Sequence, residues 1–129
     1  MNALSITSCK RLNHFEKTIS SFHKHCKDIN KIDLVLWYDD NSNDDDRTKM
    51  LKILSSYFGD KKIISTFFSK NSFSTKKRHM EIMNLWKKDL SLLSLDYVFH
   101  TEDEKDRVGS FLLLQRMDQK NHFRYQMYF

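Results

Sequence analysis

The sequence is poor in proline and glycine, the two residues that most often interrupt helices and strands. The chain of 129 residues contains no proline and only two glycines, Gly59 and Gly109. Glycine-rich phosphate loops need several glycines close together, so neither a GxGxxG turn nor a GxxxxGK[ST] loop can be built here. Both classes of phosphate site are therefore excluded.

Cysteines and long apolar runs are also scarce. Cys9 and Cys26 are the only two cysteines, too few for a disulfide framework in a chain of this size, and we interpret both as reduced thiols. No apolar run approaches the roughly 20 residues of a membrane span, and the first residues lack the layout of a signal peptide. The sequence thus predicts a cytoplasmic protein without a transmembrane segment.

The bulk composition is that of a globular chain with a mild positive charge. Hydrophobic residues make up 40% and aromatic residues 13%, which is enough to build a core. The formal net charge of +5 is compatible with an anionic ligand such as a nucleotide. It is too small and too scattered to indicate nucleic acid as a partner.

Apolar periodicity predicts alternating strands and helices. Strands are expected at residues 3–8, 33–38, 62–68, 96–100 and 122–129, the last as an edge strand, and helices at 12–29, 44–58, 76–90 and 108–117. Alternation of this kind favours parallel pairing with helices on both faces. We therefore expect an α/β fold, Rossmann-like, with three α/β/α layers and a mostly parallel sheet. Residues 1–104 would form a ligand-binding α/β domain, and 105–129 a helix and edge-strand extension of it.

Three predicted strands end in unusual polar residues. The first runs into residues 8–11 (SCKR), the second into Asp39 and Asp40, and the fourth into residues 102–104 (EDE). Parallel pairing would place all three strand ends on the same rim of the sheet, where ligands of open α/β sheets bind. This convergence predicts a binding site at that rim.

Five aspartates within eight residues repel one another unless their charges are absorbed. Asp44, Asp45 and Asp46 fall at a predicted helix start, where acids are favoured, with a cap from Ser42, Asn43 or Asp44 itself. Asp39 and Asp40 precede that helix, and they either form an Asx-turn or contact a ligand.

The acids that follow the fourth strand suit a hard cation. Glu102, Asp103 and Glu104 can bind a divalent ion through oxygen, and the alternative is a solvated acidic loop. The cations at residues 76–79 (KKRH) open a helix, where they oppose its dipole. An anionic ligand would explain them, and solvated surface is the alternative.

Together these segments resemble the nucleotide-binding half of a GT-A glycosyltransferase, close to the large family 2 group. Residues 39–43 (DDNSN) are very similar to the D-D-x-S motif after the second strand. Residues 77–79 (KRH) resemble the A-R-N motif, and 101–104 (TEDE) the DxD-type metal motif. The opening, residues 4–22, resembles the first strand and helix of the family.

The resemblance implies roles for single residues. Thr7, Ser8 and Cys9, with Arg11, would line the base and ribose, and Asp39 and Asp40 would accept a hydrogen bond from the base. Arg78 would approach the diphosphate. Glu102 would hold the ribose, while Asp103 and Glu104 would bind Mn²⁺ or Mg²⁺. The implied ligand is a UDP- or GDP-sugar, and the acceptor is unknown.

The resemblance ends near residue 104, before the acceptor half in which the family carries its general base. We therefore interpret the chain as GT-A-like but truncated, a donor-binding part that is inactive if the base is absent. The alternative is a non-catalytic α/β interaction or nucleotide-binding module, in which a homo-oligomer or another partner completes the sheet. A phosphotransfer domain with Asp39 as nucleophile is disfavoured, because Asn41 replaces the second aspartate of its motif.

Overall fold

The computed structural model describes residues 1–69, 78–93, 95, 97–102, 112–117 and 123–128, and for 78, 79, 83, 97, 99–102 and the last two segments it describes the backbone only. The strands are β1 (Asn2–Ser8), β2 (Leu34–Asp40), β3 (Lys62–Phe68), β4 (Tyr97–Glu102), β5 (Leu112–Met117) and β6 (Phe123–Tyr128). The helices are α1 (Leu12–His25), α2 (Asp44–Phe58) and α3 (Arg78–Leu92), with a short 3-10 turn at Ile29–Lys31. The predicted α/β class is confirmed.

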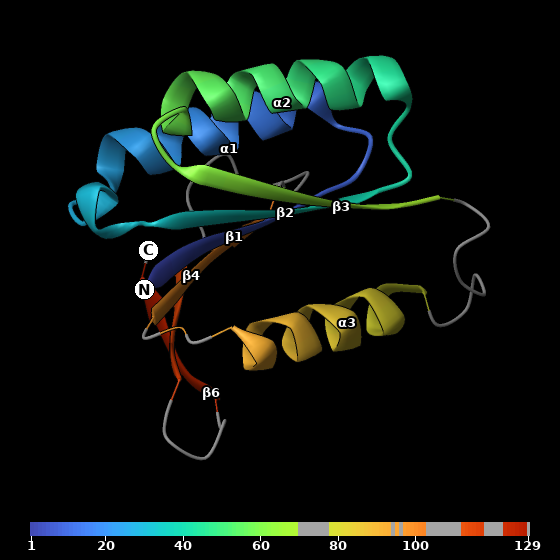
Figure 1. Ribbon diagram of the computed structural model, residues 1–129. Helices are drawn as coiled ribbons and strands as arrows, with labels where there is room; N and C mark the ends of the chain where they lie inside the picture. The colour runs from blue at the N-terminus through green and yellow to red at the C-terminus, as the bar shows by residue number, and fades with distance from the viewer. Residues whose placement is uncertain (70–77, 94, 96, 103–111, 118–122, 129) are drawn as a thin grey trace.

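These strands form one sheet in the order β3-β2-β1-β4-β5-β6. The first four are parallel, with β1 between β2 and β4, and β5 and β6 add to β4 as antiparallel strands. Figure 1 shows α1 and α2 on one face of the sheet and α3 on the other. In the same view, the carboxyl ends of β1, β2 and β3 and the first turn of α3 lie on the right.

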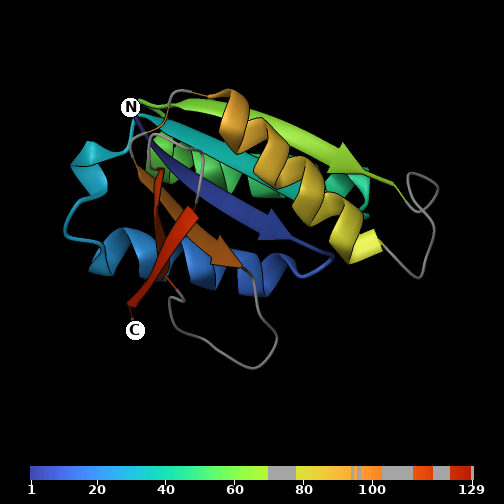
Figure 2. The same cartoon turned by 90° about the horizontal axis from the view of Figure 1, so that it is seen from below.

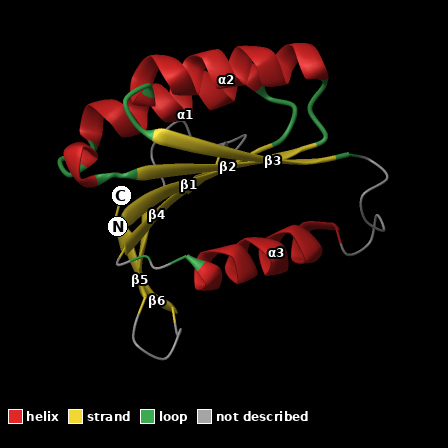
Figure 3. Ribbon diagram, in the orientation of Figure 1, coloured by secondary structure: helices red, strands yellow, loops and turns green. Residues whose placement is uncertain are grey.

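Two hydrophobic clusters lie on the two faces of the parallel strands. Alternate residues of β1 and β2, such as Ile6 and Trp37, pack with α1 and α2. The intervening residues of these strands, such as Leu36 and Tyr38, pack with Trp86 and the rest of the inner face of α3. Figure 3 shows the sheet between these helices, and Figure 2 shows α3 crossing the opposite face of the parallel strands. Burial on both faces explains why β2 reads as an uninterrupted apolar run.

Helix α2 begins as predicted. The side chain of Asn43 caps it by accepting a hydrogen bond from the Asp46 backbone N–H at 2.7 Å. Asp44, Asp45 and Asp46 fill the first turn, where the helix dipole favours their charge. The helix ends at Gly59 in a right-handed conformation, and a Cβ there would lie 2.5 Å from the Ser55 carbonyl oxygen.

Three expectations need correction. The segment expected as a helix at 108–117 is strand β5 from Leu112 to Met117, because an apolar run of this length suits either element and pairing with β4 and β6 decides. The first helix ends at His25 instead of reaching Ile29, where the 3-10 turn begins. Strand β2 extends to Asp40, so both aspartates belong to the strand. The expected edge strand at 122–129 is confirmed as β6.

Asn43→Ala is expected to lower the free energy of unfolding by about 1 kcal/mol, because it removes the side-chain cap of α2. Urea denaturation followed by circular dichroism measures the change. Asn43→Ser, which keeps a capping oxygen, serves as the control and should cost much less. Equal losses in the two variants would contradict a capping role.

Candidate functional site

The carboxyl ends of the parallel strands meet at one rim, as predicted. In the register of the sheet, Thr7 lies between Tyr38 of β2 and Glu102 of β4. Ser8 is paired with Asp39, and Asp40 with Phe68 at the end of β3. The polar ends of three strands that are distant in sequence are therefore neighbours.

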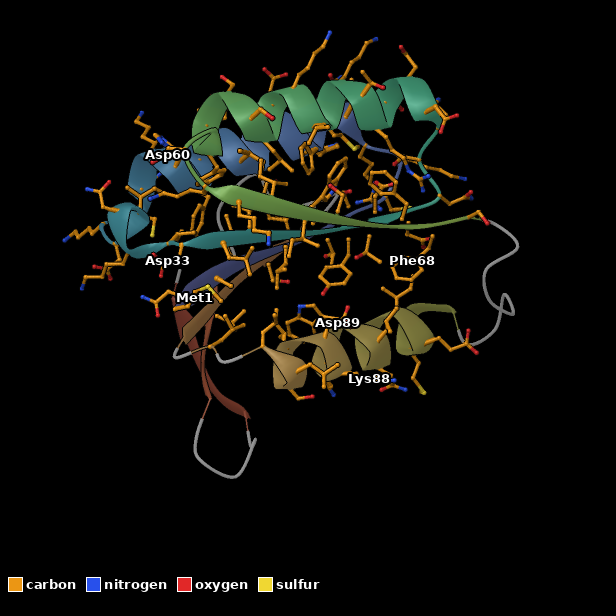
Figure 4. The ribbon with its side chains drawn as sticks, in the orientation of Figure 1. Met1, Asp33, Asp60, Phe68, Lys88 and Asp89 are labelled. Atoms are coloured by element: carbon orange, nitrogen blue, oxygen red, sulfur yellow. The ribbon has the colours of Figure 1, made fainter. Side chains whose placement is uncertain are left out.

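The rim has two sides, because side chains alternate along a strand. Ser8 and Asp39 lie on the side of α1 and α2, where Ser8 neighbours Met50. Asp40 shares the opposite side with Phe68, which packs in the cluster beneath α3. Figure 4 shows Phe68 on the side of the sheet that faces α3. The two adjacent aspartates of the D-D-x-S segment therefore face different environments.

Asp39 is fully buried and saturated with hydrogen bonds. Its Oδ1 accepts from the hydroxyls of Ser8 at 2.6 Å and Ser42 at 2.7 Å. Its Oδ2 accepts from the Ser42 backbone N–H at 3.1 Å and from Arg47 Nε at 2.8 Å. Four hydrogen bonds fill the acceptor capacity of a carboxylate. Asp39 is thus a structural residue of the rim. This geometry leaves no Asp39 oxygen to accept a hydrogen bond from a nucleotide base or to act as a nucleophile.

The hydroxyls around Asp39 extend this network into both neighbouring turns. Ser8 accepts a hydrogen bond from Trp37 Nε1 at 2.9 Å while it donates to Asp39. Ser42 accepts from the Lys10 backbone N–H at 2.9 Å while it donates to Asp39. The turn after β1 and the loop after β2 are therefore joined through one buried carboxylate.

Both of these connections contain a residue with a left-handed backbone. Lys10, after β1, has φ of 53°, and Asn41, after β2, has φ of 63°. Asn tolerates this region, whereas a lysine there is strained, and such strain persists only where the surroundings enforce it. The turns at Lys10 and Asn41 therefore lie at the rim that the sequence predicts as a binding site.

A second polar pair lies deeper on the α3 side. The Tyr38 hydroxyl donates to Asp89 of α3 at 3.1 Å, and Figure 4 shows Asp89 on the side of α3 that faces the sheet. Burial, reinforced by the nearby Asp89 carboxylate, raises the pKa of Tyr38. Tyr38 therefore remains a hydrogen-bond donor throughout the physiological pH range, and it fastens α3 beneath the rim.

The remaining predicted residues have the following positions. Thr7, Cys9, Arg11 and Asp40 are half-buried at the rim. Arg78 begins α3 and Glu102 ends β4, both described by backbone alone. Asp103 and Glu104 lie outside the described residues, and their metal role stays a prediction. Cys9 and Cys26 are not joined to each other by a disulfide.

Within the described residues, no group of three or more His, Cys, Asp or Glu side chains is placed to hold a metal ion. None of the helices in the same part of the chain has the length and apolar character that a membrane crossing requires. No family model matches the chain, and a search of curated proteins finds no match either.

Arg47 is the site residue that sequence reasoning missed. It binds Asp39 from the first turn of α2, eight positions further along the chain, and its side chain is only 15% exposed. A signal was present, because a cation in the first turn of a helix opposes the dipole and needs an anionic partner.

Asp39→Asn is expected to reduce the free energy of unfolding by about 3 kcal/mol, since it leaves the Arg47 guanidinium largely buried without its counter-charge. Urea denaturation measures the loss. Asp45→Asn is the matched control, because the Asp45 carboxylate pairs with Lys49 at the surface and such pairs contribute at most about 1 kcal/mol. Similar losses in the two variants would show that burial of Asp39 does not matter.

Proposed function

We propose that the chain is the donor-binding part of a GT-A-like glycosyltransferase of the family 2 type. It would bind a nucleoside diphosphate sugar at the rim of a Rossmann-like, three-layer α/β/α fold. The observation that carries the proposal is that the two aspartates of the D-D-x-S segment lie in different surroundings. Asp39 is consumed in shaping the loop, while Asp40 lies half-buried on the side of α3, at the strand ends.

In this proposal, the ligand occupies the α3 side of the rim. Asp40 would accept a hydrogen bond from an N–H of the base, and Thr7, on the neighbouring strand β1, would lie beside the same base. Helix α3 begins at Arg78, so its N-terminal end and that cation would face the diphosphate. Acceptors near the base and positive charge near the phosphates match the polarity of a nucleotide.

A divalent ion fits the chemistry of the acidic residues at and after the end of β4. Glu102, Asp103 and Glu104 offer the carboxylate oxygens that Mn²⁺ or Mg²⁺ prefers. When bound, such an ion supplies positive charge to the departing diphosphate. The backbone of Glu102 pairs with Thr7, so these acids begin at the same rim as the proposed base pocket.

A non-catalytic interaction module is the second candidate, and strand β3 favours it. This strand lies at one end of the strand order, and Ile64 and Phe67 on it are 37% and 46% exposed. A partner strand could pair with this edge. Such a module would show strand pairing with a partner and no response to nucleotides.

The first test is a titration with a panel of nucleoside diphosphates, with and without Mn²⁺, followed by thermal unfolding. UDP or GDP with Mn²⁺ should stabilise the protein by about 2.7 kcal/mol at 100 times the dissociation constant. Inorganic phosphate should have no such effect. Asp103→Asn should abolish the part of the stabilisation that depends on Mn²⁺. If no nucleotide stabilises the wild-type chain, the proposed function is wrong.

Asp40→Asn is expected to weaken nucleotide binding by roughly 10- to 100-fold, because it removes the charged acceptor for the base. Isothermal titration calorimetry with the best nucleotide of the panel measures the change. Asp45→Asn removes the same charge from an exposed position on α2 and should bind like the wild type. Wild-type affinity in Asp40→Asn would remove Asp40 from the site.

A further inference from the structure

We infer that Arg47 is a positioning residue, which holds the ends of β1, β2 and β3 in the geometry that presents Asp40 and Cys9 at the rim. The inference rests on the proposed nucleotide site for its effect on ligand binding. It concerns a residue that lies on the other side of the sheet from the ligand and acts through Asp39.

Arg47 joins two strand ends directly. Its Nε donates to Asp39 Oδ2 in β2, and its Nη2 donates to the Phe68 carbonyl oxygen in β3, both at 2.8 Å. The same carbonyl accepts the Asn41 backbone N–H at 2.8 Å, immediately after Asp40. The residues on both sides of Asp40 are therefore fixed by groups that Arg47 binds.

Asp39 carries the constraint to the third strand end. Its Oδ1 is shared by Ser8, the last residue of β1, and by Ser42, whose hydroxyl also binds the Lys10 backbone N–H. Cys9 lies between Ser8 and Lys10, so both of its chain neighbours belong to the network. A change at Arg47 should therefore reach Cys9 through a single intervening carboxylate.

The hydrogen bonds of this network account for the direction in which the Arg47 side chain points. A cation in the first turn is unfavourable for the helix itself. The guanidinium also stacks over the Phe67 ring, 4.4 Å from its centroid, which fixes the plane of the group. A lysine could reach one acceptor but cannot present two donors in this fixed plane, so the site requires arginine.

The left-handed turns explain why the rim needs a residue that holds its loops in place. Lys10 and Asn41 adopt a conformation that an isolated chain would leave. The hydrogen bonds from Lys10 to Ser42 and from Asn41 to Phe68 hold these turns closed. Both accepting groups are bound, directly or through Asp39, to Arg47.

The test compares Arg47→Met and Arg47→Lys with Lys49→Met, which removes an exposed cation from the same helix. The first readout is the rate at which a thiol reagent labels Cys9, with Cys26 at the far end of α1 as an internal standard. We expect both Arg47 variants to label Cys9 several-fold faster, with the rate at Cys26 unchanged. Lys49→Met should label both thiols at the wild-type rates.

The second readout is the affinity for the nucleoside diphosphate that binds best in the presence of Mn²⁺. Both Arg47 variants should bind roughly 10- to 100-fold more weakly, as is typical when a supporting partner of a binding group is lost. Full recovery in Arg47→Lys would show that charge alone suffices and would overturn the two-point positioning.

Each remaining result also decides the question. Equal acceleration at Cys9 and Cys26 would mean that Arg47 only stabilises the fold, and wild-type labelling in both Arg47 variants would show that it does not shape the rim. If the wild-type chain binds no nucleotide, the proposed function fails, whereas the labelling rates still decide whether Arg47 positions the rim. Should Arg47→Met not fold, Arg47→Lys alone gives the same comparison.

Discussion

The buried ion pair between Asp39 and Arg47 is the interaction on which the rim of this sheet depends. A fully buried carboxylate is costly unless its charge and all its acceptor sites are matched. Here the guanidinium supplies the charge, and two serine hydroxyls and one backbone N–H complete the set. These donors come from β1, from the loop after β2 and from α2, so the full set of hydrogen bonds is complete only when β1 lies beside β2 and the start of α2. The Asp39 carboxylate therefore links residues that are close in sequence, Ser42 and Arg47, to Ser8 on a different strand.

In this arrangement, the aspartate that holds the loop in shape is not the aspartate proposed to bind a ligand. Alternation along β2 directs Asp39 toward α2 and leaves Asp40 on the side of α3. One aspartate can then serve the loop while its neighbour remains at the strand ends with Thr7. A single acid could not do both, because the hydrogen bonds that hold the loop occupy every oxygen of the carboxylate.

The elements were predicted best where the physical signal is local. Residues 62–68 and 44–58 have the predicted boundaries, because a segment rich in β-branched and aromatic residues and an acidic helix start are each complete within the segment. For the cap of α2, the sequence left Ser42, Asn43 and Asp44 as alternatives, and the structure shows Asn43 in this role. The segment at 112–117 was mistaken for a helix, because three successive leucines have no period of their own and their state is set by the strands on either side.

The sequence by itself determined that strands alternate with helices, that polar residues end the strands, and that parallel pairing would gather Ser8, Asp39 and Glu102 at one rim. Only the tertiary structure decided which of the two aspartates is consumed in the fold, and that Arg47 is its partner. The physical reason is that periodicity and capping act over a few residues. The state of a buried charge, in contrast, depends on donors that different parts of the chain bring together only when the sheet and its helices have packed.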